Sequence, residues 1–451
     1  MKVSVLCSAT LFSLATFAFP ASMLKGDISK TTLAEITALT ERISRDLESK
    51  RSGAHVKRAF NAEAQRISTT GDHKYIAPGP NDLRGPCPGI NVLANHGYIP
   101  RNGISTITQM TTAANEVFGM GLDLSAFLAV YSAVMAGDLT SFSIGGKPKT
   151  GGLLGGAISS LGLLGEPQGL SASHNRFEVD GSPTRSDLYS SYVIQVSFSS
   201  FMVKITHNHS GDPVSLNLSF FDQLLSMPLG KNGIDIPVLT AFRLDRTRHS
   251  IATNGHYFSG PLQTFALNPA TYQFTYRFFA NHTAENPDGY LDATTLMSFQ
   301  GVTGEKGNYK WARGQERIPE NWYRRIIGDD YGILSFTEEA ISLEVAHPEL
   351  IRVGGNTGKP NSFTGVDIDD LTGNVFNAQT LLEGNNLMCL AFQAASEGAP
   401  DILRGLFGNV LVAVQKLASV IQPIIAELGC PELVKYDTSL FKAFPGAGTV
   451  V

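Results

Sequence analysis

The sequence predicts a mainly α-helical protein, built as a single large domain with long loops and little β-structure. Apolar residues recur at helical spacing in several segments, including residues 104–118, 123–136 and 403–427. Glycine accounts for 45 of the 451 residues, above the ordinary share of about 7%, and it is concentrated in loops such as residues 145–169. No internal repeat or long run of charge marks a boundary, so one large domain is the simplest organisation.

Composition and charge limit the partners of this chain. Hydrophobic residues make up 43% of the sequence, enough to build a large core. The net charge is −5 and the isoelectric point is near 6.1, so no basic excess is available to bind nucleic acid. No glycine-rich dinucleotide motif follows a predicted strand, which argues against a bound nicotinamide.

Residues 1–20 have the layout of a secretory signal peptide. Lys2 is followed by an apolar run, and small residues lie near its end at Ala18 and Ala21. The run is too short to cross a membrane comfortably. We therefore expect a secreted, extracellular protein without a membrane anchor, made in a compartment where cysteines pair.

Residues 21–75 form an N-terminal extension in this prediction. Within it, residues 31–49 carry leucines and isoleucines at helical spacing, which predicts an amphipathic helix that ends near Gly53. The extension is either a pro-segment or a decoration of the domain, and the sequence leaves both open.

The segment from residue 85 to 103 carries a cysteine between two prolines. Proline is tolerated at the first position of a helix, so Pro88 predicts a helix start with Cys87 as its N-cap. Free N–H groups and the helix dipole favour a thiolate there, which makes Cys87 a candidate nucleophile or metal ligand. The alternative is a buried or disulfide-bonded cysteine in a turn.

The string PCPGINVLANHGYIPRNG, residues 86–103, closely resembles the proximal haem segment of the fungal haem-thiolate peroxidases, the family of chloroperoxidase and the unspecific peroxygenases. The resemblance, of the long peroxygenase type, runs from about residue 76 to 435. It implies a peroxidase domain over residues 76–435, a C-terminal tail over residues 436–451, and haem b with Cys87 as the axial thiolate of its iron.

Residues 174–187, HNRFEVDGSPTRSD, contain a second candidate site. Two carboxylates and a hydroxyl, on Glu178, Asp180 and Ser182, are spaced so that they can converge on a hard cation. The alternative is a polar loop with a turn at Asp180 and a helix cap at Ser182. The resemblance implies that Glu178, the carbonyl of Val179 and Ser182 hold Mg²⁺ or Mn²⁺ against a haem propionate.

The segment RFFANHTAE, from Arg277 to Glu285, supplies a candidate acid–base pair. Peroxide activation needs a group that takes a proton from one oxygen and returns it to the departing oxygen, beside a positive charge. The long peroxygenases that the chain resembles carry Arg and Glu seven residues apart on one helix. Here the separation is eight, which rotates Glu285 by about 80° on a regular helix. Either the helix has ended near Glu285, as Asn286-Pro287 favours, or it carries a bulge. We expect a one-residue bulge between Asn281 and Ala284 to return Glu285 to the face of Arg277.

Other roles are open for this segment. If they do not work in catalysis, Arg277 and Glu285 belong to a surface ion pair or a solvated helix end. His282 is a second candidate for proton transfer, although a spacing of five turns it away from Arg277. Phe279 is expected to wall the haem pocket, and the resemblance implies that Phe177 packs over the haem, with plain core packing as the alternative for Phe177.

The C-terminal part carries two further cysteines. The resemblance implies that Cys389 and Cys430 pair, which leaves Cys87 free for the haem iron. The apolar helix over residues 403–427 is either a membrane anchor or, as we expect, a buried helix of the core. Glycosylation sequons, which suit a secreted protein, begin at Asn208, Asn217 and Asn281.

The resemblance implies an enzyme in which H₂O₂ forms a ferryl-oxo intermediate opposite Cys87, and this species oxygenates or oxidises a small organic substrate. No reductase is needed, because peroxide supplies the oxidising equivalents. An oxidase dedicated to one secondary-metabolite pathway and a halide-oxidising haloperoxidase are the enzymatic alternatives. A secreted haem-binding protein without catalysis is the non-enzymatic one.

Overall fold

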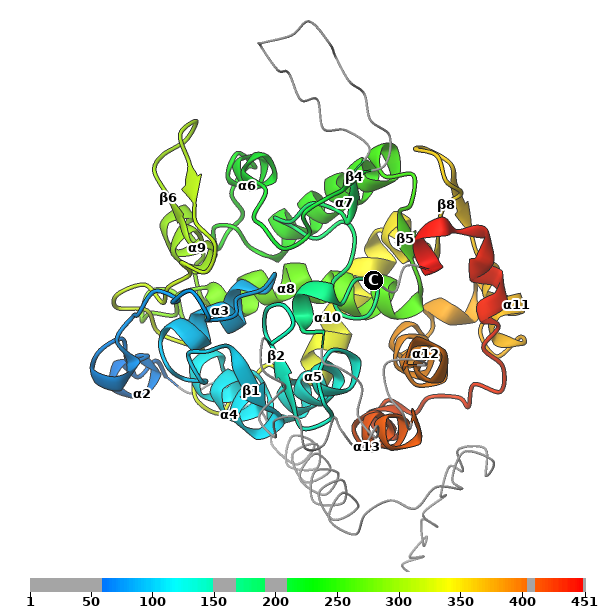
Figure 1. Cartoon of the computed structure of the whole chain (residues 1–451), viewed down its shortest axis with the longest axis horizontal. Helices are drawn as coiled ribbons and strands as arrows, with labels where there is room; N and C mark the ends of the chain where they lie inside the picture. Colours follow the sequence, from blue (N-terminus) through cyan, green and yellow to red (C-terminus); the bar gives the residue numbers. More distant parts are fainter. Residues whose placement is uncertain (1–58, 149–167, 191–208, 404–409, 449–451) are drawn as a thin grey trace, which may run out of the picture.

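The computed structural model describes residues 59–148, 168–190, 209–403 and 410–448, and this part of the chain is mainly helical, as predicted (Figure 1). The α-helices are α2 (Ala62–Gln65), α3 (Pro88–Asn95), α4 (Ile107–Phe118), α5 (Leu122–Met135), α6 (Leu218–Leu225), α7 (Ile236–Thr253), α8 (Asn268–Phe279), α9 (Ala293–Gln300), α10 (Ile333–Ala346), α11 (Ile368–Thr372), α12 (Asn386–Leu403) and α13 (Val410–Leu428). The predicted signal peptide, the predicted helix over residues 31–49, most of the glycine-rich loop and Asn208 lie outside the described residues.

The described β-structure consists of short antiparallel pairs and one three-stranded sheet. In the sheet, Gly355 lies opposite Phe258 on one side and Thr364 on the other. The pairs are β1 (Ile104–Thr106) with β2 (Ser141–Ser143), β3 (Tyr189–Ser190) with β4 (His209–Ser210) and β6 (Val302–Thr303) with β7 (Lys310–Trp311), and the sheet is β5 (Phe258–Ser259), β8 (Gly354–Asn356) and β9 (Phe363–Gly365).

One helix begins later than the sequence predicts. The first residues of the predicted helix 104–118 form β1, because a capping box between Thr106 and Gln109 satisfies the first N–H groups of α4 from Ile107 onward. The helix predicted over residues 403–427 corresponds to α13, whose described part begins at Val410.

Helix α5 lies in the centre of the apolar core. Between Asp123 and Met135 it is buried at every residue except Leu128, as expected for a helix that is apolar nearly all round. It packs against α4 on one side and α13 on another. The ring of Phe127 meets Phe392 of α12 edge to face, with 5.2 Å between ring centroids, so α5 ties the N-terminal helices to the C-terminal ones.

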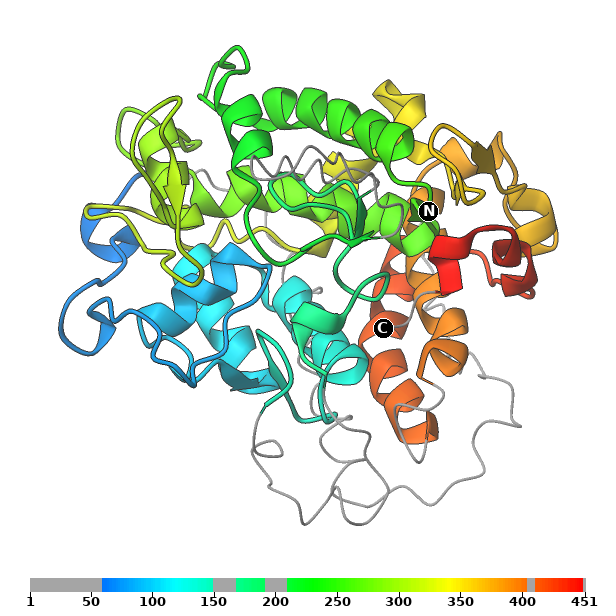
Figure 2. The same cartoon turned by 45° about the horizontal axis from the view of Figure 1, so that its top comes forward.

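Helix α8 lies in the middle of the molecule in both cartoon views (Figures 1 and 2). It follows directly on a π-helical turn, η6 (Gln263–Leu267), and packs against α7, α9 and α10. The helix ends at Phe279, because Ala280 leaves helical geometry with φ −58° and ψ 138°, and Asn281 instead forms a β-bridge with Tyr290. Single π-helical turns frequently occur at functional sites.

Both ends of the described chain pack onto the domain. The side-chain amide of the buried Gln65 donates to the carbonyl of Arg324 at 2.9 Å, and Ile67 belongs to the core. At the other end, the ring of the buried Phe444 lies 5.8 Å from that of Phe258 in β5. Residues 59–75 and the described part of the predicted tail are therefore packed against the domain.

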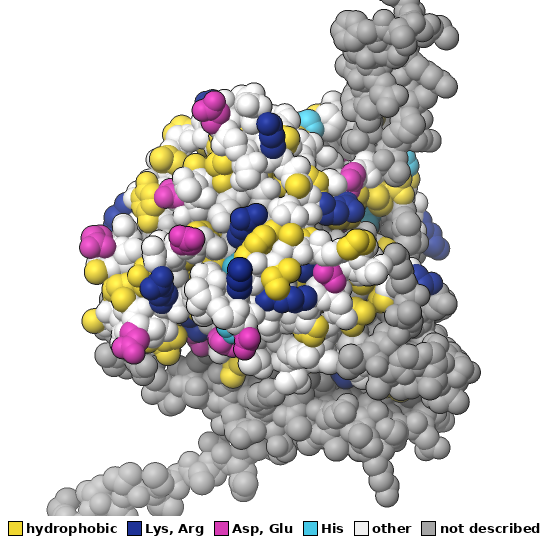
Figure 3. Space-filling view, turned by 60° about the vertical axis from the view of Figure 1, so that its left-hand side comes forward, with side chains coloured by type: hydrophobic (Ala, Val, Ile, Leu, Met, Phe, Trp, Pro, Cys, Tyr) yellow, Lys and Arg dark blue, Asp and Glu magenta, His cyan; other side chains and the backbone are white. Residues whose placement is uncertain are grey.

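Cys389 and Cys430 form a disulfide, which confirms the pairing that the resemblance implies. It ties α12 to the chain just beyond the end of α13, two helices that also pack together. Within the described ranges, none of the helices is both long and apolar enough to span a membrane. On the face drawn in Figure 3, acidic and basic side chains are interspersed with apolar ones.

Candidate active site

Cys87 is the N-cap of α3, and Pro88 occupies the first helical position, as the sequence predicts. The turn before the helix is fixed by Asn91, whose side chain accepts from the N–H of Gly85 at 3.0 Å and donates to its carbonyl at 2.9 Å. A Cβ on Gly85 would lie 1.9 Å from the carbonyl oxygen of Ile144, so only glycine fits there. Local structure thus presents the sulfur at the start of the helix.

The Cys87 thiol is free and half-buried. Burial raises its pKa, whereas the N–H groups of Ile90 and Gly89 and the Arg185 guanidinium lower it. The net shift is upward, so the helix terminus alone does not produce the thiolate that the sequence predicted, because desolvation outweighs it. A bound metal ion would displace the proton and stabilise the thiolate at this position.

Two buried charges lie close enough to affect this thiol. The Arg185 side chain donates through Nη1 to Thr184 Oγ1 at 3.1 Å, while its buried Nε and Nη2 have no hydrogen-bond partner. Glu316 is 1% exposed, and one of its oxygens accepts from Asn91 at 2.9 Å while the other has no partner. A buried guanidinium with free donors fits a carboxylate of a haem propionate. No motif around Glu316 marked it in the sequence.

The loop with the predicted cation ligands is buried. Glu178 has a side chain 7% exposed, with one oxygen 2.6 Å from Nδ1 of His174 and the other without a partner. Val179 and Ser182 are buried in the same loop. The donors fit a hard cation that completes its shell with water. Of these ligands only Glu178 is an acidic side chain, and the others are a backbone carbonyl and a hydroxyl. The described residues contain no cluster of three or more His, Cys, Asp or Glu side chains that could hold a metal ion.

His174 affects the charge of this loop. Burial alone would lower its pKa, but Asp180 and Glu178 together raise the pKa of His174 to about 9. A protonated His174 therefore neutralises part of the negative charge of Glu178 near neutral pH. Sequence reasoning placed His174 in the segment without giving it a role, because the contact with Glu178 depends on how the loop folds.

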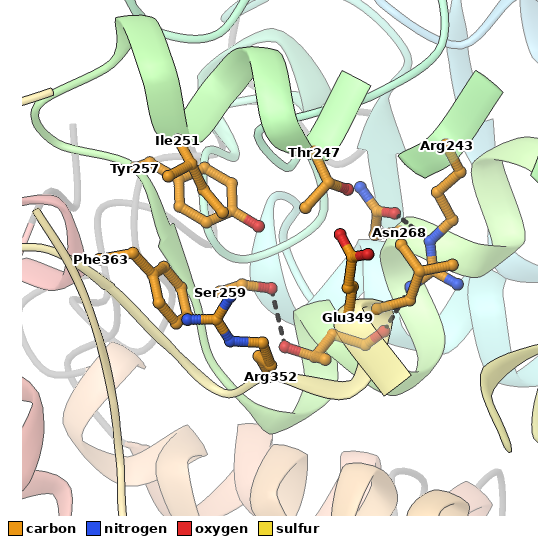
Figure 4. Close-up of a pocket in the computed structure, with 11 residues that line it drawn as sticks. Arg243, Thr247, Ile251, Tyr257, Ser259, Asn268, Glu349, Arg352 and Phe363 are labelled. Atoms are coloured by element: carbon orange, nitrogen blue, oxygen red, sulfur yellow. Dashed lines mark hydrogen bonds between the residues drawn. The ribbon is translucent and has the colours of Figure 1, made fainter. Parts of the chain in front are cut away.

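The N-terminal end of α8 holds this loop in place. Asn268 donates to the carbonyl of Asp180 at 3.0 Å, and the Tyr272 hydroxyl donates to the carbonyl of Gly181 at 2.6 Å. Gly181 has φ +70°, which favours glycine. Figure 4 shows Arg243 of α7 reaching Asn268, with Nε 2.7 Å from Oδ1. The pocket there has a volume of about 10 Å³, room for roughly one water.

The two predicted pocket phenylalanines occupy different environments. Phe177 is half-buried, and its ring centroid lies 5.9 Å from that of Tyr131 in α5. Phe279 is 5% exposed and stacks on Phe299 at 4.4 Å. It also lies against the first turn of α3, 3.6 Å from the position of a Cβ on Gly89. Phe279 therefore packs in the core, whereas Phe177 keeps a surface that a cofactor could cover.

Arg277 and Glu285 are not brought together. Helix α8 ends at Phe279, so the bulge predicted between Asn281 and Ala284 is wrong. Glu285 is fully exposed, and its own N–H and the Thr283 hydroxyl lower its pKa. The catalytic role of Glu285 stays a prediction that this geometry does not support.

Arg277 instead pairs with Glu339 of α10. His282 is buried and its Nδ1 donates to the carbonyl of Pro287 at 3.0 Å; burial lowers its pKa to about 4. An imidazole with so low a pKa is a weak base, so His282 is poorly suited to accept a proton. The Arg277 partner was missed in the sequence because it is 62 residues away.

The fold and site define a class of protein. A mainly helical domain presents a free thiol at a helix start, near a buried guanidinium with two unpartnered donor nitrogens, and this arrangement suits a thiolate-ligated haem. Comparison with known proteins gives the same class. A family model described as "Peroxidase, family 2" matches residues 73–327.

Three relatives are similar over most of their length. The dothistromin biosynthesis peroxidase dotB of Dothistroma septosporum is 41% identical over 389 residues, 86% of this chain and 87% of the relative. The aromatic peroxidase fscJ of Fusarium equiseti is 36% identical, with 96% and 95% covered. The aromatic peroxygenase of Cyclocybe aegerita is 28% identical, with 81% and 83% covered. The chain belongs to the family 2 peroxidases, the fungal haem-thiolate peroxidases, and is an oxidoreductase acting on peroxide.

Proposed function

We propose that this protein is a secreted peroxygenase or peroxidase that uses H₂O₂ to oxygenate or oxidise a small organic substrate on a Cys87-ligated haem b. The observation that carries the proposal is the free thiol at the start of α3, near the Arg185 guanidinium whose Nε and Nη2 have no partner, in a chain of the haem-thiolate family. No reductase is required, because the peroxide is both oxidant and oxygen source.

Each part of the site has a defined task in this proposal. Bound haem supplies the redox chemistry of its iron. Cys87 would ligate that iron and donate electron density to it, Arg185 would hold a propionate, and Phe177 would cover part of the macrocycle. The carboxylate of Glu178, with the carbonyl of Val179 and the hydroxyl of Ser182, holds Mg²⁺ or Mn²⁺ beside a propionate.

The assignment of Cys87 is tested by spectroscopy. We expect the reduced holoenzyme with carbon monoxide to show the strongly red-shifted Soret band of thiolate ligation. Cys87→Ala should lose this band and the peroxide-dependent turnover, because the described residues contain no other free thiol that could replace Cys87 as ligand. A Cys87→Ala variant that keeps the band would refute the assignment. Cys87→His offers a nitrogen ligand in place of sulfur, so a variant that binds haem without the thiolate band shows that the ligand has changed and the haem has not been lost.

Secretion is part of the proposal. It is supported by the signal-peptide pattern of residues 1–20 and by the disulfide between Cys389 and Cys430, which suits an oxidising compartment. Expression of the full chain in a secreting host should yield extracellular protein that begins downstream of residue 20. Retention in the cytosol with residues 1–20 intact would contradict it.

A second candidate function is an oxidase dedicated to one secondary-metabolite pathway. It is favoured by a specific observation: a relative 41% identical over most of both chains carries the name of a biosynthetic pathway. A substrate panel with ¹⁸O-labelled peroxide separates the two functions. Label in products from many unrelated aromatics supports a general peroxygenase, whereas turnover of a single structural type supports the dedicated enzyme.

A further inference from the structure

Three polar side chains of α3 and its C-cap are buried. Asn91, Asn95 and the C-cap residue His96 are 0%, 0% and 1% exposed. Asn91 and Asn95, four residues apart, lie on the same side of the helix, and His96 follows at its end. Because buried polar side chains are stable only with hydrogen-bond partners, α3 needs partners from another part of the chain.

Most of these partners come from one segment, residues 314–318, which we call the strap. Asn95 Nδ2 donates to the carbonyls of Gly314 and Glu316, at 2.8 Å each. His96 Nε2 accepts from the N–H of the last strap residue at 3.1 Å. The backbone of the strap is thus bound to the C-terminal end of α3 without any contribution from the Glu316 side chain.

The Glu316 side chain reaches the first turn of the helix instead. Its Oε1 accepts from Asn91 Nδ2 at 2.9 Å. The same Asn91 amide donates to the carbonyl of Gly85 at 2.9 Å and accepts from its N–H at 3.0 Å. The N–H of Asn91 also donates to the carbonyl of Cys87 at 3.3 Å. Only one side chain therefore separates Glu316 from the turn that presents the sulfur.

Glu316 makes this orientation of the Asn91 amide the favourable one. A side-chain amide has two hydrogens on its nitrogen, and here Gly85 and Glu316 both accept from it. Without Glu316 Oε1, a buried donor would lose its partner, which is costly. An amide that turned to satisfy this donor would give up a hydrogen bond to Gly85, two residues before Cys87.

The charge of Glu316 has the opposite effect on the site. Burial and, more weakly, the Glu316 carboxylate raise the pKa of Cys87, so this charge opposes a thiolate. Its Oε2 is buried without a partner, a cost that attachment of the strap backbone does not require. The contact that favours ligation is therefore the hydrogen bond to Asn91.

We propose that Glu316 is a positioning residue for the proximal ligand: through Asn91, it holds the turn from Gly85 to Cys87 so that the sulfur stays on the haem iron. The inference rests on the proposed function above and extends that site to the strap. Hydrogen bonds behind a metal ligand commonly decide how firmly the ligand is held. Variants that break the contact between Glu316 and Asn91 should therefore lose the iron–sulfur bond more readily.

The test compares Glu316→Asp with Glu316→Gln in the reduced holoenzyme with carbon monoxide. Aspartate keeps the charge but is one methylene shorter, so it withdraws from Asn91, whereas glutamine keeps an acceptor oxygen at the same reach. The measured quantity is the ratio of thiolate-type to thiolate-free Soret absorbance. We expect this ratio to fall about tenfold or more in Glu316→Asp and to stay within about twofold of the wild type in Glu316→Gln.

A structural control removes a different contact of the strap. His96→Leu loses the hydrogen bond from the last strap N–H and leaves Asn91 untouched. It should lower the free energy of unfolding while the band ratio stays at the wild-type value. The double variant Asn91→Leu, Glu316→Asp should match Asn91→Leu alone, because Glu316 acts through Asn91.

Each of three results would overturn the proposal. An unchanged ratio in Glu316→Asp would show that the contact with Asn91 does not hold the ligand. An equal loss in Glu316→Gln would assign the effect to charge, and an equal loss in His96→Leu would assign it to the strap as a whole. A wild-type holoenzyme without the thiolate band would refute the proposed function itself, which is a different result.

Discussion

At the scale of single residues, two opposing effects act on Cys87: the N–H groups at the start of α3 favour its thiolate, and burial favours its thiol. The position of Cys87 follows from a local rule, the preference of proline for the first turn of a helix, and the structure has Pro88 there. The pKa follows from burial, which depends on distant parts of the chain and raises it. Arg185 and Glu316, the charges that act on the thiol, come from segments 98 and 229 residues further along, so no local pattern relates them to it.

Arg185 gives a prediction at this scale. A buried guanidinium with unpartnered donors is costly in the protein without haem. Arg185→Met should therefore leave the stability of the haem-free protein unchanged or higher, while haem transfer to a scavenging protein becomes about tenfold faster or more, equivalent to about 1.4 kcal/mol. Arg248→Met, at an arginine with a 58% exposed side chain, is the control. Equal haem retention in Arg185→Met and the wild type would show that Arg185 does not hold the cofactor.

At the scale of elements, α8 shows where sequence periodicity stops being informative. The string RFFANHTAE continues an apolar pattern, and the nearest local stop is Asn286-Pro287. The helix nevertheless ends at Phe279, because Asn281 bridges to Tyr290 and its side chain accepts from the N–H of Tyr323 at 2.9 Å. These contacts are not local, so the end of the helix, and with it the partner of Arg277, could not be predicted.

The disulfide gives a prediction for the pair α12 and α13. Cys389 and Cys430 are 41 residues apart, and closing a loop of that length stabilises the folded state by about 4 kcal/mol in the chain-entropy model. The double variant Cys389→Ser, Cys430→Ser should lose up to about this much unfolding free energy in denaturant titration, with the Cys87-dependent carbon monoxide band retained. A loss of that band would instead mean that the bridge supports the haem site.

At the scale of the whole molecule, the mainly helical class was predictable, because helical spacing repeats along the chain and each long helix buries an apolar face. The boundary between the predicted N-terminal extension and the domain was harder to predict. Residues 59–75 pack against the domain through Gln65 and Ile67, although the sequence before residue 76 lacks the family motifs. The pairing of Arg277 with Glu339 depends on α8 and α10 packing side by side, which only the assembled fold determines.

The buried pair between α7 and α10 makes the stability of the whole molecule depend on pH. Glu344 is 0% exposed and lies 3.3 Å from Arg243. Burial raises the pKa of Glu344 to about 8, although Arg243 acts in the opposite direction. In the unfolded chain a glutamate titrates near about 4.5. Between these values the folded state holds a proton that the unfolded state has lost, so the contribution of Glu344 to stability falls as pH rises.

Glu344→Gln removes this titration and keeps a side chain of the same shape beside Arg243. Between about pH 4.5 and 8, the unfolding free energy of the wild type should fall relative to that of Glu344→Gln by up to about 1.4 kcal/mol per pH unit. Urea titrations of both proteins at half-unit pH steps measure the difference, which should become constant above pH 8. Parallel curves across the whole range would mean that Glu344 is ionised in the folded protein throughout, and that Arg243 outweighs burial.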